Sequence, residues 1–298
     1  MSKKQFIKRH FLIINKLKQK PCAFVDIQKH LAFHSQLDEE DYQISIRSFQ
    51  RDLIEILSIY QIEIKFNRSE NVYEIYDNQN EPVNERLTDA FMIFDTMKLA
   101  QNNADEIYFE QQKSSGLENA FILLHAIKNS FEICFVHKKY WDEIGSVKKV
   151  QPYAIKEFKN RWYLIGLDTE NNQIRTFGLD RISEIEVTKT KLIAPAKNTN
   201  SELFRHSFGI IYNDSLPQKI VLQVSNFQTN YLKSLPLHAS QKIVSENKNH
   251  SIVELFIHAT HDFKMEILSL GNEVTVLEPN SFKQEVREIL KQSLKNYQ

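Results

Sequence analysis

The chain has 298 residues, with 38 basic and 38 acidic side chains and a formal net charge of zero. Its length predicts two or three domains. The neutral balance excludes a protein that coats nucleic acid indiscriminately, so any such contact must come from local patches. The six glycines form no GxGxxG or GxxxxGKS/T motif, which excludes the glycine-rich phosphate loops.

The cysteines and the apolar patterning indicate the cellular compartment of the protein. Cys22 and Cys134 lie far apart and have no metal-ligand spacing, which indicates a reducing compartment. No apolar run is long enough for a membrane span, and charged residues interrupt the segment from Phe6 to Leu17. Neither a signal peptide nor a membrane helix is therefore expected. We predict a cytoplasmic protein with no membrane partner.

Motifs of catalysis and metal binding are missing from the sequence. His30 and His34, like His258 and His261, are spaced as in metal sites, but neither pair has an obvious third ligand. The sequence contains no GxSxG elbow and no Cys–His nucleophile arrangement. We therefore predict no metal, no cofactor and no enzymatic activity.

The chain is predicted to begin with two helices. Between Lys3 and Lys20, apolar residues at helical spacing predict one buried stripe, formed by Ile7, Phe11, Ile14 and Leu17. Pro21 ends this helix. A second, shorter helix is expected to turn Phe24, Ile27 and Leu31 inward.

A third helix, predicted from about Ser45 to Leu57, has an apolar face and a basic face. The apolar face consists of Ile46, Phe49, Leu53 and Ile56. At about 100° per residue, Arg47 and Arg51 fall on the opposite face, one turn apart, with Ser48 beside them. Two outward arginines and a small hydroxyl suit the major groove of DNA, where arginine pairs with guanine edges or phosphates.

Two alternating segments follow this helix, residues 62–66 and 72–76, and they predict a β-hairpin with a polar tip. Three helices followed by a hairpin are the arrangement of a winged helix-turn-helix. The run Ser45-Ile46-Arg47-Ser48-Phe49-Gln50-Arg51-Asp52-Leu53 resembles the SxRTxxRDL recognition-helix signature of winged-helix regulators that carry WYL domains. Ser48 replaces the usual threonine and keeps the hydroxyl.

This resemblance implies that residues 1–80 form a DNA-binding domain. The implied DNA contacts are Ser45, Arg47, Ser48, Gln50 and Arg51 on the helix, with Lys65 and Arg68 on the wing. Asp52 is expected to orient an arginine rather than to approach phosphate. The alternative is an ordinary small helical domain whose arginines are merely solvated.

Residues 81–115 are interpreted as a helical linker. A helix predicted from Asn84 to Gln101 carries a broad apolar stripe, formed by Leu87, Phe91, Phe94, Met97 and Leu99. This stripe either packs on its own domain or faces a second copy of the chain as a dimer seam. We expect a homodimer.

A helix from Leu117 to about Asn129 and several short strands are predicted next. Strand patterns fill residues 131–135 and 147–153, and a hairpin follows within residues 162–179. Arg161 and Arg175 flank the apolar core of this hairpin. They are either merely solvated or part of a binding face, because the planar arginine fork suits phosphate or carboxylate.

The hairpin resembles the core of the WYL domain, named after the tripeptide that stands here as Trp162-Tyr163-Leu164. The match extends to Pro152-Tyr153, to Lys159-Asn160-Arg161 and to the run Arg175-Thr176-Phe177-Gly178-Leu179-Asp180-Arg181-Ile182. The resemblance implies an Sm-like β-barrel over residues 116–194. It also implies a bacterial transcription regulator that senses a ligand, often a nucleic acid or nucleotide. Trp162 and Leu164 are expected in the barrel core.

The effector pocket expected from this resemblance consists of His137, Tyr153, Lys156, Arg161, Tyr163, Arg175 and Arg181. Aromatic rings among basic side chains suit stacking on bases and pairing with phosphates, and each stacked base contributes about 1–3 kcal/mol. WYL relatives commonly carry a tyrosine where His137 falls, so this departure affects the polarity and pH response of the pocket. A lone histidine is also commonly structural.

Residues 195–298 are predicted to form a third domain. Strand and helix patterns follow one another there in the order β-α-β-β-α-β, which is the ferredoxin-like plan, and a last helix runs from Ser281 to about Asn296. The ending, Leu268-Ser269-Leu270-Gly271 followed by Val274, Val276-Leu277 and Pro279, resembles the WCX extension that often follows a WYL domain. The tryptophan common there is absent, with Glu266 near its place, and no ligand residues are carried over.

The sequence thus predicts an α+β multidomain protein: a winged helix-turn-helix, an Sm-like β-barrel and a ferredoxin-like C-terminal domain. Its predicted function is that of a bacterial-type transcription regulator that binds double-stranded operator DNA. A nucleotide or single-stranded nucleic-acid effector, bound by the WYL domain, would change the affinity for DNA. The alternative is an RNA- or single-stranded-DNA-binding adaptor that never binds promoters.

Overall fold

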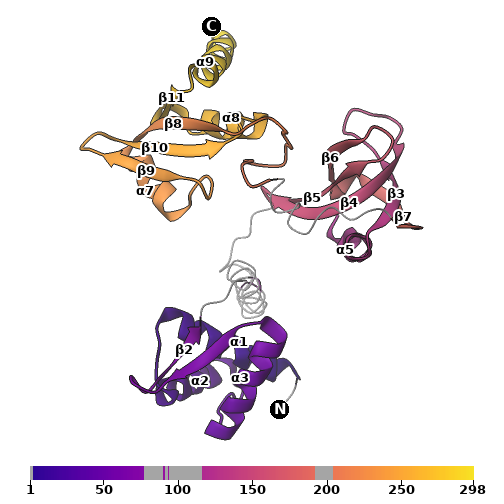
Figure 1. Cartoon of the computed structure of the whole chain (residues 1–298). Helices are drawn as coiled ribbons and strands as arrows, with labels where there is room; N and C mark the ends of the chain where they lie inside the picture. The colour runs from indigo at the N-terminus through magenta and orange to yellow at the C-terminus, as the bar shows by residue number, and fades with distance from the viewer. Residues whose placement is uncertain (1–2, 77–89, 91–92, 94–115, 192–203) are drawn as a thin grey trace. The chain divides into compact units, whose positions relative to one another are not determined.

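The computed structural model describes residues 3–76, 90, 93, 116–191 and 204–298. The chain divides into two compact units, Met1–Phe109 and Glu110–Gln298, whose elements are labelled in Figure 1. The predicted linker helix from Asn84 to Gln101 and its apolar stripe lie outside the described residues, apart from Ala90 and Ile93. Among the helices that the structure describes, none combines the length and the apolar character needed to cross a membrane.

The first unit contains three helices followed by a two-stranded antiparallel hairpin, the element order of a winged helix-turn-helix. These elements are α1 (Lys3–Gln19), α2 (Phe24–Asp38), α3 (Ile46–Tyr60), β1 (Glu63–Asn67) and β2 (Val72–Tyr76). The hairpin pairs Glu63 with Tyr76 and Asn67 with Val72. Its polar tip, residues 68–71, forms the turn, as the turn-forming residues predict.

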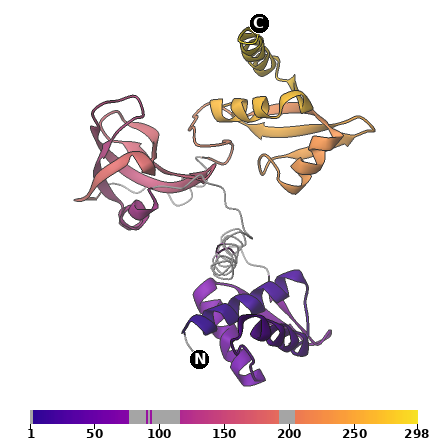
Figure 2. The same ribbon diagram turned by 180° about the vertical axis from the view of Figure 1, so that it is seen from behind.

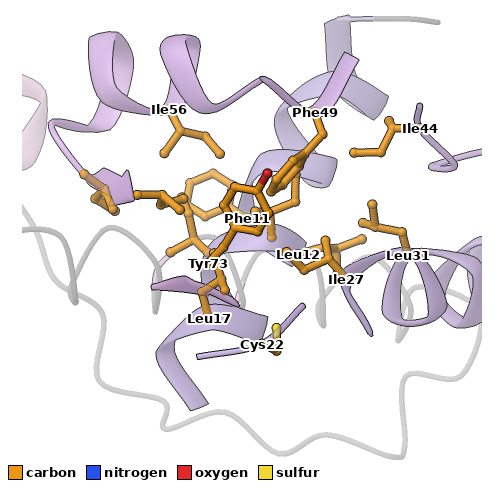
Figure 3. Close-up of a cluster of buried hydrophobic side chains, with 14 of the residues drawn as sticks. Phe11, Leu12, Leu17, Cys22, Ile27, Leu31, Ile44, Phe49, Ile56 and Tyr73 are labelled. Carbon is orange, nitrogen blue, oxygen red and sulfur yellow. The ribbon is translucent and has the colours of Figure 1, made fainter. Parts of the chain in front are cut away.

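One apolar core holds this unit together (Figure 3), and it includes Phe11, Leu31, Phe49 and Tyr73. Two predicted core residues are exposed: Ile7 retains 41% and Ile46 46% of its accessible surface. Ile46 is the first residue of α3 and lies just beyond its N-cap. On α1 the buried residues run without a break from Lys8 to Ile14, because α2 and β2 both pack against this helix. A single apolar stripe was therefore the wrong description of α1.

The second unit begins with a helix and a five-stranded antiparallel sheet. The elements are η1 (Leu117–Asn119), α5 (Ala120–Asn129), β3 (Phe131–His137), β4 (Ser146–Phe158), β5 (Arg161–Asp168), β6 (Gln173–Gly178), η2 (Leu179–Arg181) and β7 (Ile182–Lys191). The strand order is β6-β5-β4-β3-β7, and α5 packs against β3, β4 and β7. Within the described ranges the edge strands β6 and β7 do not pair with each other, so closure into the expected Sm-like barrel stays a prediction.

Side chains from α5 and all five strands or their connections build the core of this sheet. Leu164 is fully buried there, and Trp162 is partly buried against the same cluster. The prediction that these two residues of the tripeptide belong to the core is confirmed. Tyr163, between them, points to the other face because side chains alternate along a strand, and it is buried there.

The C-terminal part follows the predicted order of elements. They are β8 (Gln218–Ser225), α7 (Asn226–Ser234), β9 (Lys242–Glu246), β10 (His250–Ile257), α8 (His261–Ser269), η3 (Gly271–Glu273), β11 (Val274–Glu278) and α9 (Asn280–Lys295). The antiparallel sheet has the order β11-β8-β10-β9, and Figure 2 shows its long central strands from behind. Ser225 and Thr260 cap α7 and α8 through their hydroxyl groups, as N-cap residues commonly do.

Candidate nucleic-acid interface and cationic cluster

Helix α3 presents the predicted DNA contacts to solvent. Arg47, Gln50 and Arg51 are exposed, while Phe49 and Ile56 on the other face are fully buried in the core. Burying the apolar face fixes the rotation of the helix about its axis. The two arginines, four residues apart, are therefore held outward on the same face.

The serines at the start of α3 have a structural role. Ser45 is the N-cap, and its hydroxyl oxygen accepts a hydrogen bond from the backbone N–H of Ser48 at 3.2 Å. The Ser45 hydroxyl also lies 3.2 Å from the Ser48 hydroxyl. A cap of this kind contributes about 1 kcal/mol to helix stability. It also leaves the first turn of α3, with its free N–H groups, at the surface.

Arg47 and Arg51 of α3 are used in no ion pair among the described residues. Within the part of the chain that the structure describes, no carboxylate lies within ion-pair distance of Arg47 or Arg51. Glu55, one turn beyond Arg51, does not pair with it. Both guanidinium groups are therefore available to an external anion.

A buried ion pair anchors α3 to α1. Arg9 donates two hydrogen bonds to Asp52, at 2.7 Å from Nε and 2.9 Å from the terminal nitrogen, and both side chains are almost fully buried. Burial raises the pKa of Asp52, but His10 and Arg9 lower it by more, so the pKa lies below its ordinary value. Asp52 does orient an arginine, as predicted, but that arginine is Arg9, which the sequence analysis did not single out.

The predicted wing contacts lie on the hairpin. Arg68 is exposed in the turn between β1 and β2. The Lys65 ammonium group lies 3.3 Å from Glu63 and 3.2 Å from the centre of the Tyr76 ring. Glu63 thus partly neutralises the charge of Lys65. Of the two predicted wing contacts, the exposed Arg68 is the more available to an external anion.

Two of the predicted effector residues, Arg161 and Arg181, meet in one cluster at an end of the β3–β7 sheet. Arg161 begins β5, and Asp180 and Arg181 lie in η2. Tyr140, in the β3–β4 loop, connects them: its hydroxyl donates to Asp180 at 2.7 Å and accepts from Arg161 at 2.5 Å. The Arg181 guanidinium lies over the Tyr140 ring, 4.7 Å from its centre. We call Tyr140, Arg161, Asp180 and Arg181 the cationic cluster.

The cationic cluster keeps a net positive charge, because two arginines share one aspartate. Arg161 and Arg181 lie 3.8 and 3.7 Å from Asp180. The Nε of Arg181 is buried and has no hydrogen-bond acceptor among the residues described. Gly178 makes this packing possible: a Cβ there would lie 2.5 Å from the Asp180 carboxylate and 2.7 Å from the Arg181 guanidinium.

Two aromatic residues, one within this cluster and one next to it in sequence, were not predicted from the sequence. Tyr140 belongs to the cluster, and Trp141 follows it in the chain with 77% of its surface exposed. Lys138 and Lys139 precede them in the same loop. An aromatic pair within a lysine-containing loop is the signal that would have found them, since exposed aromatics beside cations suit base stacking.

Two further predicted residues are buried close to the cluster. Burial raises the pKa of Tyr163, which also lies near Arg161 and Arg181. His137 packs edge-on against Phe177 at 5.3 Å. Its pKa is lowered by burial and then by Arg181 and nearby lysines. This lowering favours the neutral form of the His137 ring.

The remaining predicted effector residues lie elsewhere. Arg175 pairs with Gly166 across the β5–β6 ladder, five residues along β5 from Arg161, and its guanidinium lies 3.7 Å from Asp168. Tyr153 is half-buried on β4, and burial raises its pKa. The structure therefore does not bring Arg175 to the cationic cluster, because the register of the hairpin separates them.

Lys156 belongs to a different set of contacts. Its ammonium group donates to the backbone carbonyl of Gly209 and lies over the ring of Phe204, 4.5 Å from its centre. Burial lowers the pKa of Lys156, and the charge of Asp262 opposes this. We call residues 204–212, which follow the gap after β7, the connecting segment.

The connecting segment contacts both sheets of the second unit. Thr176 of β6 donates to the carbonyl of Ile210 at 2.9 Å. Asp262, in the first turn of α8, accepts from the N–H of Ile210 at 2.8 Å. Phe208 lies between Phe158 and Phe263, with ring centres 5.5 and 5.7 Å apart. A side chain at Gly209 would collide with Asp262 at 2.3 Å.

The predicted absence of metal chemistry concerns the two histidine pairs. His30 and His34 lie with ring centres 4.6 Å apart on α2, but no group of three or more histidine, cysteine, aspartate or glutamate residues able to hold a metal ion occurs in the described parts of the chain. The absence of a metal site stays a prediction.

The second unit matches two family models. Residues 118–187 match the WYL domain, and residues 216–294 match the WCX domain. Protein PafB of Mycobacterium bovis and of Mycobacterium tuberculosis is 26% identical to this chain over 174 residues, covering 55% of the chain and 49% of each relative. The chain thus spans about half the length of these relatives.

Two solved structures are also similar. The proteasome accessory factor B/C of Arthrobacter aurescens matches 95% of this chain and 45% of its own, with 17% identity and a TM-score of 0.36. A CRISPR Cas-related protein matches 99% of this chain and 85% of its own, with 12% identity and a TM-score of 0.41.

Proposed function

We propose that this chain, which carries a WYL domain followed by a WCX domain, is a DNA-binding transcription regulator controlled by an effector. The observation that carries the proposal is the exposed face of α3, where Arg47 and Arg51 lie one turn apart and have no acidic partner in the described residues. The pairing of this helix with a hairpin wing supports duplex DNA as its target.

In this proposal α3 enters the major groove. Arg47 and Arg51 pair with guanine edges or phosphates, and Gln50 between them reaches a base edge. Ser45 and Ser48 bring the first turn of the helix close to a phosphate, where free N–H groups favour an anion. Arg68, at the tip of the hairpin, contacts the neighbouring backbone. These contacts explain how a neutral chain binds a polyanion through one local patch.

The effector site in this proposal is the cationic cluster. Its net positive charge suits a phosphate. The Arg181 side chain has a buried donor without an acceptor among the described residues, which suits it to bind one. The exposed ring of Trp141 offers a stacking surface for a base. A nucleotide or a single-stranded nucleic acid combines both groups, which is why we favour it as the effector.

The connecting segment provides a route from one sheet of the second unit to the other. Thr176 and Lys156 hold it from the WYL side, and Asp262 holds it from the WCX side. An effector that prefers one arrangement of the WYL sheet would thereby shift the populations of two global states. In a homodimer, such a shift changes how the two recognition helices fit an inverted-repeat operator.

Mobility shifts with duplex fragments selected from the source genome test the proposal. Changing Arg47 or Arg51 to alanine should weaken operator binding by about 1–3 kcal/mol and reduce the salt dependence by about one ion. The matched control is Lys248→Ala, which removes an exposed cation from the β9–β10 loop and should leave affinity unchanged. Wild-type affinity in both arginine variants would refute the proposal.

The alternative function is that of an adaptor for RNA or single-stranded DNA that binds no promoter. The exposed Trp141 beside the cationic cluster favours this alternative, because stacking requires unpaired bases. Competition between a genomic duplex and single strands at stated salt separates the two functions. An adaptor would bind the single strand even after Arg47 and Arg51 are both changed, and it would show no preference for any duplex.

A further inference from the structure

A groove runs between β11 and α9 at the far end of the chain. On one side it is lined by three successive residues of β11, Val274, Thr275 and Val276. Successive side chains of a strand point to opposite faces. Val274 and Val276 are buried, and Thr275 between them is exposed. Residues of both faces of β11 therefore line this groove, which places it along the edge of the strand.

The edge of β11 has no strand partner on this side. In the sheet order β11-β8-β10-β9 the strand is terminal, and β8 is its one neighbour among the described residues. An edge of this kind presents unpaired N–H and C=O groups, which are a template for another strand. The groove thus contains a row of backbone groups able to form hydrogen bonds.

The other wall of the groove is helix α9, which carries an apolar row and a basic row. Val286, Leu290 and Leu294 follow one another at intervals of four residues, and all line the groove. Val286 is buried, but Leu290 and Leu294 retain 52% and 58% of their surface. Figures 1 and 2 show the distal end of α9 extending away from the sheet that it follows. An apolar row is thus left uncovered next to a free strand edge.

The basic row consists of Lys283, Arg287 and Lys291, which line the same groove. Lys291 lies 2.7 Å from Glu288. Lys283 and Arg287 have no carboxylate within ion-pair distance in the portion of the chain that the structure describes. The groove is therefore apolar at its centre and positively charged along its length, so that an acidic occupant is complementary to it.

We propose that the β11–α9 groove binds an acidic peptide of a partner protein, which adds in extended conformation to the edge of β11. Backbone hydrogen bonds to β11 supply affinity, and side chains of the peptide supply specificity. Its aliphatic side chains cover Leu290 and Leu294, while its carboxylates pair with Lys283 and Arg287. About five residues of the peptide match the length of β11, at about 3.4 Å per residue.

A second copy of this chain is a less suitable occupant of the groove. Symmetric pairing of two β11 edges would bring together the basic rows of two α9 helices. Like charges placed opposite one another destabilise an interface. The acidic peptide avoids this repulsion. The proposal concerns a surface remote in sequence from α3 and from the cationic cluster, so it does not depend on the function proposed above.

Fluorescence anisotropy with the full-length chain tests the proposal. The probe is a labelled peptide of about eight residues in which glutamate and valine alternate, with a matched peptide that carries lysine in place of glutamate. The acidic peptide should bind, and its affinity should fall when salt rises, because the contacts involve exposed charges. The lysine peptide should not bind. Absence of binding by the acidic peptide would overturn the proposal.

Charge reversal identifies the groove as the binding site. In the double variant Lys283→Glu, Arg287→Glu the preference should switch, so that the lysine peptide binds and the acidic peptide is at least ten-fold weaker. Lys295→Glu is the matched control, because this exposed lysine lies on α9 but outside the groove, and it should retain the wild-type preference. Equal effects of both changes would contradict a specific groove.

Two further measurements separate strand addition from other modes of binding. Leu290→Ser should weaken the acidic peptide at least five-fold without changing the circular dichroism spectrum, because this side chain is half exposed. Hydrogen exchange of the amides of residues 274–278 should slow when the peptide is bound. Binding without this protection would rule out strand addition. Self-association of the free chain that Leu290→Ser abolishes would assign the groove to a second copy instead.

Discussion

The arginines of α3 and those of the WYL sheet lie in different electrostatic surroundings. Arg47 and Arg51 project from a helix without an acidic neighbour among the described residues. Arg161 and Arg181 share Asp180, and Tyr140 connects them. Free arginines suit a ligand that supplies many negative charges, such as duplex DNA. Arginines held by a shared aspartate are oriented in advance, which suits a smaller ligand with few phosphates.

The first prediction concerns Arg9, which unlike the arginines compared above is almost fully buried. Asp52→Asn leaves the Arg9 charge without its carboxylate in the core, so the first unit should lose about 3–5 kcal/mol of unfolding free energy. Hydrogen exchange of the α1 and α3 amides measures this loss. Glu55→Gln, on the same helix, is the control, because Glu55 forms no ion pair within the described part of the chain. A loss below 1 kcal/mol would mean that the pair does not anchor α3.

The loss of stability at low pH follows from the same ion pair of Arg9 and Asp52. Because the folded pKa of Asp52 is lowered, its stabilising effect is present above the ordinary aspartate pKa of about 3.9 and is lost as pH falls below it. Asp52→Asn should remove this part of the pH dependence.

The second prediction concerns stacking at the cationic cluster. Trp141→Ala should weaken binding of a single-stranded oligonucleotide by about 1–3 kcal/mol, and duplex binding should stay at the wild-type level. Anisotropy with a labelled single strand measures the effect. Ile144→Ala, an equally exposed apolar residue of the same loop, is the control. If both variants bind equally well, the loop takes no part in the effector site.

The third prediction tests how the clustered arginines are oriented. Tyr140→Phe removes the hydroxyl between Arg161 and Asp180 but keeps the ring beneath Arg181. Effector affinity should fall by about 0.5–1.5 kcal/mol, the usual net contribution of one hydrogen bond. Tyr231→Phe, on the exposed surface of α7, should have no effect. An unchanged affinity in the Tyr140 variant would show that the arginines need no such connection.

The fourth prediction concerns the pH dependence of the first unit. Burial, then His34 and Lys16, lower the pKa of His30 to about 4. The folded first unit therefore disfavours the charged form. Its stability should be full above the ordinary histidine pKa of about 6.5 and should decline as pH falls from there towards 4. His30→Gln should flatten this decline in a urea titration at several pH values, and a variant that keeps the full decline would contradict the assignment to His30.

Periodicity and motif resemblance predicted most of the elements of both units. The apolar spacing of α3 placed Phe49 and Ile56 in the core and its arginines outside, because one buried face determines the other. The alternation of β5 placed Leu164 inward. The β-α-β-β-α-β order of the C-terminal part was also readable, since each element there has its own pattern.

Contacts between distant segments could not be predicted in this way. Arg9 and Asp52 are 43 residues apart, and no local pattern distinguishes Arg9 from the other cations of α1. Lys156 was expected in the effector pocket, but it binds the backbone of Gly209, 53 residues later. Arg175 was grouped with Arg161, although the register of the hairpin separates them. Such pairings depend on tertiary packing, which a single sequence does not encode locally.

The most direct test measures the duplex affinity of Arg161→Ala with and without a single-stranded oligonucleotide, at one salt concentration. The account predicts that the folded variant binds operator duplex as tightly as the wild-type chain does, and that the oligonucleotide no longer changes this affinity. A variant that is folded but binds duplex more weakly in the absence of any effector would contradict the separation between the α3 arginines and the cationic cluster.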